Sequence, residues 1–242
     1  MDWTDEGIVL SARRHGEAAA VASLLTRAHG RHAGLMRGGW GKRGRALLQP
    51  GNAVHVRWRA RLSEQLGTFT LEPERSAAAR LFNDPLRLAA LASACALADA
   101  ALPERESHPA VHDGLAGLLA ALTQDTSDWP EMYVRWEVGL LADLGFGLDL
   151  KRCARTGTET DLAFVSPRTG RAVSAEAAGP WRERLLALPG FLSGADESAG
   201  TNAVAQGLAL TAHFLERHVF APHGRTLPAA RRRLAAFRLV AG

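Results

Sequence analysis

The sequence predicts an α+β protein in which a small barrel of five strands precedes an all-helical domain. Five short segments with partial two-residue alternation occupy about the first 75 residues, and after Pro73 the apolar residues recur at helical spacing. A polar stretch at residues 146–176 interrupts the helices. Apolar residues make up 47% of the chain and charged residues 22%, which is the balance of a folded globular protein.

The five predicted strands are separated by Gly-rich turns. They cover residues 6–12, 19–28, 31–37, 53–60 and 66–72. The fourth alternates most clearly, with Val54, Val56 and Trp58 on one face and Arg57 and Arg59 on the other. Five strands of this length suit a closed barrel, and the five-stranded OB-fold is the common solution that binds oligonucleotides. The period alone equally allows an SH3-like barrel.

The remainder of the chain is predicted to be mostly helical. Asn83-Asp84 precedes Pro85, which begins an Ala/Leu-rich helix that ends at about Leu102 and is apolar nearly all round. A second helix is predicted for residues 109–122, and a third is capped by Ser127-Asp128 and ends at Gly145. Further helices are expected at residues 177–187, 202–220 and 228–240.

The organisation that follows is an OB domain at residues 1–78 and a helical domain at residues 79–242. The polar stretch at residues 146–176 is expected to form a loop with a short hairpin. Phe164, Val165 and Val173 supply its strands, and residues 167–170 its turn, because Pro and Gly favour turns.

Composition also predicts where the protein works. No run approaches the roughly 20 apolar residues of a membrane span, and the first residues lack the pattern of a signal peptide. The two cysteines, Cys95 and Cys153, lie in an apolar helical run and a loop, so a disulfide framework is not expected. We therefore expect a cytoplasmic protein without contact to a membrane.

The net charge of +4 conceals a strong asymmetry along the chain. Between Arg13 and Arg61 there are eleven cations and one acid, Glu17, which gives +10 and leaves −6 for the other residues. A separation of charge of this kind predicts a surface for a polyanion, most often nucleic acid or an anionic membrane. A solvated basic face is the alternative.

The basic segment 37–45 combines four cations, several glycines and Trp40. Phosphate attraction together with base stacking is the chemistry of single-strand binding, so we expect this flexible segment to contact nucleic acid. Trp40 could instead be a core residue at the barrel edge. The predicted contacts are Arg13, Arg14, Arg31, Arg37, Trp40, Lys42, Arg43, Arg45, Arg57 and Arg59. The later run 231–233 is interpreted as a solvated helix face, with a second phosphate contact as the alternative.

Motifs for catalysis are not found, so no enzymatic activity is predicted. The segment 38–43 lacks the spacing of a phosphate loop and has Arg43 where a magnesium-binding hydroxyl would be needed. His108 and His112 have the spacing of a helical zinc pair, but no Glu follows His108 and no third ligand is evident. There is no Gly-x-Ser-x-Gly elbow, and the carboxylates are scattered. A hydrolase would need a pocket with converging titratable residues.

Several stretches in the same order resemble the RecO recombination-mediator family. Those that resemble its OB domain are Glu6-Gly7-Ile8-Val9-Leu10, Arg13-Arg14-His15-Gly16-Glu17, Leu24-Leu25-Thr26, Gly30 and the basic turn that ends at Arg45. Those that resemble its helical part are Arg135-Trp136-Glu137-Val138-Gly139-Leu140-Leu141, Leu144-Gly145-Phe146, residues 164–174, Leu188-Pro189-Gly190-Phe191-Leu192 and Leu227-Pro228-Ala229-Ala230-Arg231. Each motif is weakly specific, and their order along nearly the whole chain carries the resemblance.

The resemblance implies an OB domain followed by a helical domain, without an active site. It implies binding to single-stranded and double-stranded DNA and annealing of complementary strands. It also implies RecR, the acidic C-terminal tail of the single-stranded-DNA-binding protein and, indirectly, RecA as partners. For the acidic tail, Arg135 beside the apolar stripe of residues 129–144 is the candidate cation. Arg135 could instead pair with Glu131 one turn earlier.

Zinc is the one cofactor that the resemblance raises. Many members carry four cysteines that form a zinc site in the loop after the central helix, whereas here Cys153 has Thr156 at the position of a Cys-x2-Cys partner. Cys95 is interpreted as a small core residue. Ligands from His213, His218 or His223 would require the loop to pack against the late helices. We therefore predict a protein without zinc or any other cofactor.

One alternative shares the charge pattern. An OB-type module for RNA or for a protein surface, without a role in recombination, would also carry a basic barrel. The dependence of affinity on salt for single-stranded DNA, duplex DNA and RNA would distinguish these ligands.

Overall fold

The computed structural model describes residues 1–124, 126–194 and 201–236. The chain divides into two compact units, each described by itself below. The first comprises Met1–Thr126 and Pro228–Leu234, and the second comprises Ser127–Leu227 with the residues from Ala235.

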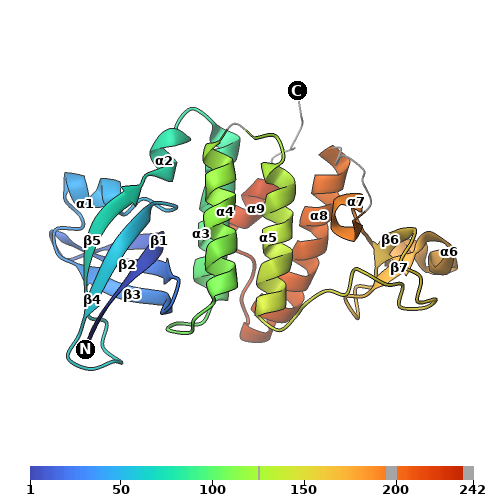
Figure 1. Cartoon of the computed structure of the whole chain (residues 1–242), viewed down its shortest axis with the longest axis horizontal. Helices are drawn as coiled ribbons and strands as arrows, with labels where there is room; N and C mark the ends of the chain where they lie inside the picture. The colour runs from blue at the N-terminus through green and yellow to red at the C-terminus, as the bar shows by residue number, and fades with distance from the viewer. Residues whose placement is uncertain (125, 195–200, 237–242) are drawn as a thin grey trace. The chain divides into compact units, whose positions relative to one another are not determined.

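The first unit contains a closed barrel of five strands (Figure 1). The strands are β1 (Asp2–His15), β2 (Ala19–Thr26), β3 (Gly30–Met36), β4 (Ala53–Arg59) and β5 (Thr68–Arg75), in the order β1-β2-β3-β5-β4. The first half of β1 pairs with β4 and its second half with β2, while β3 and β5 meet in parallel at Leu35 and Thr68. The predicted five-stranded OB-type barrel is confirmed. Strand β1 is longer than expected because it pairs with both β2 and β4.

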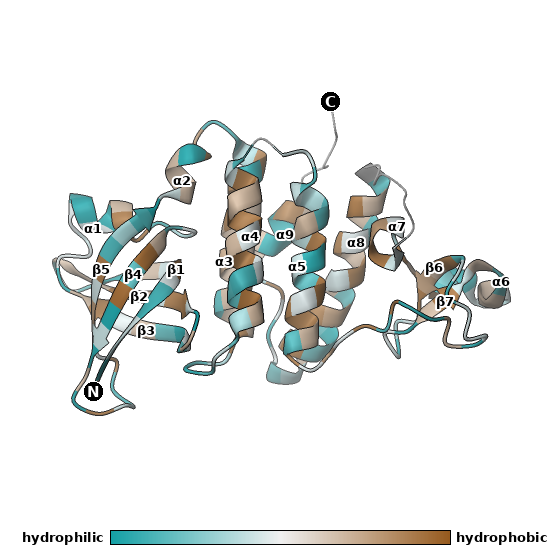
Figure 2. Cartoon of the chain, viewed as in Figure 1, coloured by the Kyte–Doolittle hydropathy of each residue, from teal (hydrophilic) through white to brown (hydrophobic). Residues whose placement is uncertain are grey.

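Alternation along β4 shows why this sequence closes into a barrel. Val54, Val56 and Trp58 are at most 2% exposed, and Arg57 and Arg59 between and beyond them are exposed, as predicted. In Figure 2, brown apolar residues lie among paler and teal residues along the strands. Burial of each large apolar side chain contributes roughly 1.5–3 kcal/mol, so the register of β4 is fixed by its inward face.

The basic segment after β3 is not the flexible turn that the glycines suggested. Lys42–Leu47 form a short helix, α1, that follows a turn at Gly38, where φ is +68°. A Cβ on Gly44 would lie 2.6 Å from the backbone of Gly39, so the helix packs tightly on the turn. The prediction of flexibility was wrong because Lys, Arg, Ala and Leu after Gly41 are good helix formers.

Helices complete the first unit. They are α2 (Ala77–Arg80), α3 (Pro85–Ala101), α4 (Pro109–Thr123) and α9 (Ala229–Ala236), of which the last belongs to this unit up to Leu234. Helix α3 begins at Pro85 as predicted, and Asp84 caps it, because its carboxylate accepts a hydrogen bond from the backbone of Arg87 at 3.0 Å. Of the helix expected at residues 228–240, positions 237–240 lie outside the described residues.

Helix α3 packs against the outer face of β1 and β2. Asp99 on α3 accepts hydrogen bonds from Ser11 on β1 at 2.8 Å and from Ser23 on β2 at 2.6 Å. This contact explains why α3 is buried on more than one face and why part of the barrel is closed to ligands.

The second unit is built around α5 (Trp129–Asp143) and α8 (Thr201–Phe214), which pack against each other. Helix α8 continues as the π-helix η2 (Leu215–Phe220) and the 3₁₀ turn η3 (Ala221–His223), so the helix expected at residues 202–220 is confirmed. Asp128 precedes α5 as predicted, but its side chain makes no capping hydrogen bond. Its φ of −93° and ψ of 2° differ from the extended backbone of a capping residue.

A small sheet forms the excursion of the second unit. Its strands are β6 (Leu162–Val165), β7 (Ala172–Ser174) and β8 (Leu186–Ala187), in the order β7-β6-β8. The predicted hairpin is confirmed: the backbone N–H of Gly170 donates to Ser166 at 2.9 Å, and the φ of Gly170 is +68°.

The helix expected at residues 177–187 is wrong. The chain instead forms α6 (Ala175–Ala178), the 3₁₀ helix η1 (Gly179–Arg184) and strand β8, and α7 (Gly190–Ser193) follows. Gly179 has a φ of +44°, and Pro180 has no backbone N–H, so a continuous α-helix cannot pass through this pair. Among the residues described, no helix has both the length and the apolar character needed to cross a membrane.

Candidate nucleic-acid-binding site

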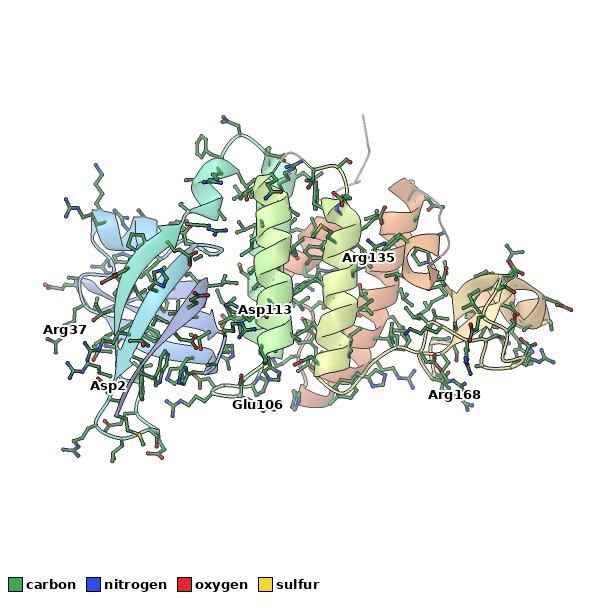
Figure 3. The ribbon with its side chains drawn as sticks, viewed as in Figure 1. Asp2, Arg37, Glu106, Asp113, Arg135 and Arg168 are labelled. Atoms are coloured by element: carbon green, nitrogen blue, oxygen red, sulfur yellow. The ribbon has the colours of Figure 1, made fainter. Side chains whose placement is uncertain are left out.

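Six of the predicted cations gather at one end of the barrel, which we call the α1 end. They are Arg13, Arg14, Arg37, Lys42, Arg43 and Arg45. The turn between β1 and β2 lies beside the segment that leads into α1, because the backbone N–H of Trp40 donates to Ala18 at 2.9 Å. All six side chains are exposed, and Figure 3 shows Arg37 pointing away from the ribbon.

The cations of the α1 end are free of carboxylate partners. Within the part of the chain that the structure describes, none of the six forms an ion pair. The guanidinium of Arg14 donates to the backbone of Gly16 at 3.0 Å and of Glu17 at 3.3 Å. Exposed cations without partners can exchange their counterions for phosphates, so this end has the electrostatics of a polyanion site.

Trp40 is half-buried and packs against the barrel core. This supports the alternative that it is a core residue at the barrel edge. Its main contribution at the α1 end is to fix the turn that carries Arg37 and leads into α1.

Arg57 and Arg59 form a separate set, which we call the β4 face. They lie beside the first half of β1, whereas Arg13 and Arg14 lie on its second half. Arg57 donates to the carboxylate of Asp2 at 2.9 Å, and Arg59 lies 3.8 Å from it. The hydrogen bond from Arg57 lowers the pKa of Asp2, and the charges of both arginines lower it further against the effect of burial. The β4 face is therefore partly neutralised.

Arg31 belongs to a third environment, the helix-covered side of the barrel. Its guanidinium donates to the backbone of Leu102 at 2.8 Å and lies 3.7 Å from Asp99, and its side chain is only 22% exposed. Arg27 on the same side donates to both oxygens of Asp113, which is labelled on α4 in Figure 3. These arginines hold helices against the barrel.

Arg105 completes the helix-covered side, and the sequence did not identify it. Its backbone N–H donates to Arg31 at 2.8 Å, and its guanidinium donates to the carbonyls of Ser63, Glu64 and Gln65. It has a φ of +64°, which is uncommon for a residue with a side chain. A single arginine thus joins the connection between α3 and α4 to β3 and to the loop between β4 and β5.

The interior of the barrel near this loop is filled by aromatic rings. His32 is 4% exposed and contacts Trp3, Trp58 and Phe69, and neither ring nitrogen has a hydrogen-bond partner among the residues described. Burial lowers the pKa of His32 to about 4, and the charges of Arg105 and His29 contribute. The ring is neutral at physiological pH, so this part of the barrel is a packed core.

Arg135, the candidate for binding an acidic tail, is held by its own unit. It lies 3.3 Å from Glu131 one turn earlier, donates to the backbone of Phe191 at 2.9 Å, and lies over the Phe191 ring at 5.3 Å. The pairing with Glu131 is therefore present. Half of the side chain remains exposed at 49%.

The loop after α5 holds Cys153 without a second thiol. The sulfur accepts a hydrogen bond from the Ser174 backbone at 3.3 Å and lies 3.6 Å from the Ser174 hydroxyl. Burial raises the pKa of the thiol, but hydrogen bonds from Thr156 and Ser174 lower it to about 6. The residues around the sulfur are hydroxyl and backbone donors, and these do not fit a zinc ion, which needs thiolate, imidazole or carboxylate ligands.

Two other motifs have structural environments. His108 and His112 are 7% and 6% exposed, and His112 lies 3.1 Å from Asp113. No group of three His, Cys, Asp or Glu side chains suited to a metal ion occurs among the residues that the structure describes. The sequence predicted that the run 231–233 forms a solvated helix face. This is wrong for Arg231, which is fully buried, whereas Arg232 and Arg233 are exposed.

The amino-acid sequence is similar to those of known proteins over nearly its whole length. Two family models match the chain, the N-terminal part of recombination protein O at residues 1–76 and its C-terminal part at residues 83–227. A DNA repair protein RecO of Rhodospirillum centenum is 63% identical over 235 residues, which cover 96% of this chain and 93% of that protein. The RecO of Rhodospirillum rubrum is 53% identical, with 96% and 94% covered, and that of Phenylobacterium zucineum 52% identical, with 96% and 95% covered.

Proposed function

The chain belongs to the RecO family of DNA repair and recombination proteins, which are non-enzymatic mediators, and from this premise we propose how its surfaces are used. The α1 end binds single-stranded and double-stranded DNA through its phosphates. The protein anneals complementary strands and, with RecR, assists the loading of RecA on strands that the single-stranded-DNA-binding protein covers.

The observation that carries this proposal is the set of six exposed cations at the α1 end, for which the described residues supply no ion-pair partner. Each phosphate that a cation neutralises releases close to one counterion, so a cluster of free cations gives strong, salt-dependent binding without base specificity. Trp40 fixes the turn beneath them. Arg31, Arg57 and Arg59 are weaker candidates for phosphate contacts, because their guanidinium groups already contact acids or carbonyls of the barrel unit.

For the acidic tail of the single-stranded-DNA-binding protein we keep Arg135 as the proposed cation. The tail would insert an apolar end beside Phe191 and place its carboxylates on the half-exposed guanidinium. This requires the tail to compete with Glu131, so the affinity of the tail peptide should fall in Arg135→Ala and rise in Glu131→Gln. Unchanged affinity in both variants would place the tail elsewhere.

The domain division also remains a proposal. The two family models leave residues 77–82 between them, which supports an OB domain at residues 1–78 and a helical domain at residues 79–242 as sequence modules. DNA as the ligand favours the cytoplasm as the location.

The decisive experiment is strand annealing with and without the single-stranded-DNA-binding protein. Two complementary labelled oligonucleotides are mixed with the full chain, and duplex formation is followed over time. We expect acceleration on both bare and protein-covered strands. Parallel titrations of RNA test the alternative: a preference for RNA and no acceleration of annealing would support an RNA-binding module instead.

A further inference from the structure

One tryptophan of the second unit is left open to solvent. Of the six tryptophans in the chain, Trp181 is 54% exposed, whereas the other five are buried or half-buried. Trp181 lies on the 3₁₀ helix η1, outside the core of either unit. Exposure of a single aromatic side chain is common on protein surfaces, so a ligand site is inferred here from the side chains that surround Trp181.

Two arginines of the same helix lie over aromatic rings. The guanidinium carbon of Arg184 lies over the Trp181 ring, 5.4 Å from its centroid, and that of Arg182 lies over the Phe164 ring of β6, also at 5.4 Å. A 3₁₀ helix has three residues per turn, so residues 181 and 184 are stacked one above the other. The helix therefore places an open indole and the guanidinium of Arg184 on one face, while Arg182 projects from another face onto Phe164.

This combination matches the contacts that proteins use for single-stranded nucleic acid. An unpaired base stacks on an indole, and guanidinium groups bind the neighbouring phosphate and add cation–π attraction. The segment carries charges of both signs: Glu176 and Glu183 are exposed, and Arg155 donates to the backbone of Ala177 at 3.1 Å. We therefore expect stacking on the indole to supply a larger share of the affinity here than at the α1 end.

We propose that Trp181, with Arg182 and Arg184, is a second contact for single-stranded DNA, at which an unstacked base lies on the open indole. The proposal rests on the annealing activity proposed above. Annealing brings two strands to one protein, so it requires a contact for each strand. A stacking contact in the other unit holds the partner strand while leaving its base edges free to pair.

Bases of a duplex are stacked on each other and cannot use this surface without being extruded. The contact therefore distinguishes single strands from duplex, whereas the phosphate contacts of the α1 end do not. Its affinity should also depend less on salt, because stacking of a base on an indole releases no counterions.

The experiment uses the full chain and an oligonucleotide of thymidines. Intrinsic fluorescence is titrated in the wild type and in Trp181→Phe, so that the difference reports this indole alone. We expect most of the quenching to be lost in Trp181→Phe. Trp181→Ala should weaken binding of single strands by between about 5-fold and about 150-fold at high salt, where phosphate contacts are screened, and should slow annealing. Duplex affinity should remain as in the wild type.

Phe82→Ala is the matched control, since Phe82 is an 81% exposed aromatic in the first unit with no cation on its ring among the residues described. It should leave quenching and annealing unchanged. If a folded Trp181→Ala anneals and binds single strands like the wild type, the proposal is overturned. It is equally overturned if this variant loses only an acidic peptide, which would make the surface a protein contact. If the wild type itself fails to anneal, the proposed function fails, and the fluorescence titration still tests the contact.

Discussion

The α1 end and the helix-covered side of the barrel both carry arginines, and they use them differently. At the α1 end, six cations are exposed and have no carboxylate partner in the part of the chain that the structure describes. On the helix-covered side, Arg27, Arg31 and Arg105 contact Asp113, Asp99 and backbone carbonyls. A cation that the fold has left unpaired binds phosphate more readily than a paired one, so the number of cations in the sequence overestimates the strength of the binding surface.

The largest effect is expected from Lys42→Ala, Arg43→Ala and Arg45→Ala combined. Three lost phosphate contacts should reduce the slope of log affinity against log salt by about 2 for single strands, which corresponds to roughly 100-fold weaker binding at about 0.1 M salt. Fluorescence anisotropy over a salt series measures both. A triple variant that conserves charge, with Arg at residue 42 and Lys at residues 43 and 45, should keep the slope. An unchanged slope in the folded alanine variant would show that the α1 end is not the DNA contact.

The sequence predicted the barrel well because its information is local. The alternation of Val54, Val56 and Trp58 follows from a period of two residues, and the basic run 37–45 is visible without any structure. The helix α1 was missed because three glycines at residues 38–41 dominated the interpretation. The role of Arg31 could not be predicted, since its partners Asp99 and Leu102 are distant in sequence and meet it only through the packing of α3.

Arg31→Ala should lower the stability of the protein and leave DNA binding unchanged, which is the opposite of the result expected for the α1 end. Removal of the guanidinium leaves the part-buried Leu102 carbonyl without its donor, so the free energy of unfolding should fall by about 1–3 kcal/mol. The salt slope of DNA binding should stay the same. Urea unfolding measures the first quantity, and Arg61→Ala, at an exposed position, is the control with a change within about 0.5 kcal/mol. If Arg31→Ala is as stable as the wild type and loses slope, Arg31 is a DNA contact after all.

The arginines of the β4 face are partly paired, and one substitution should make them as available to DNA as the cations of the α1 end. Asp2→Asn removes the carboxylate that Arg57 and Arg59 share, so both become available to phosphates. The salt slope should rise by at most about 1, and affinity at about 0.1 M salt by up to about 10-fold. Glu216→Gln removes an exposed acid from the second unit and controls for the change in net charge. Equal gains in both variants would mean that only net charge matters and that pairing on the barrel does not.

Treatment with a chelator is expected to have no effect. The second unit, too, contains a side chain that the fold already holds, in contrast to side chains that are free to bind a ligand. Cys153 resembles a ligand in the sequence, yet its sulfur is already held by Ser174 and Thr156, just as Arg31 is held by α3. The melting temperature should therefore be the same with and without a chelator, and metal analysis should find no zinc. About one zinc ion per chain, lost together with stability on chelation, would refute this.

The free energy of unfolding should depend on pH if hydrogen bonds to the Cys153 sulfur hold the loop. The pKa of Cys153 is about 6 in the folded chain, below its ordinary value of 9.0. The folded state therefore favours the thiolate, so the stabilisation is complete above pH about 9 and is lost as the pH falls through about 6. Cys153→Ala should therefore lower the free energy of unfolding most at pH about 9, and this loss should become smaller as the pH falls to about 6. Unfolding curves at a series of pH values measure it. Cys95→Ala is the control, because burial raises the pKa of that thiol to about 12 and keeps it neutral over this range. A cost of Cys153→Ala that is independent of pH would show that the sulfur acts as a neutral packing group, as Cys95 does, and that hydrogen bonds to a thiolate do not hold the loop.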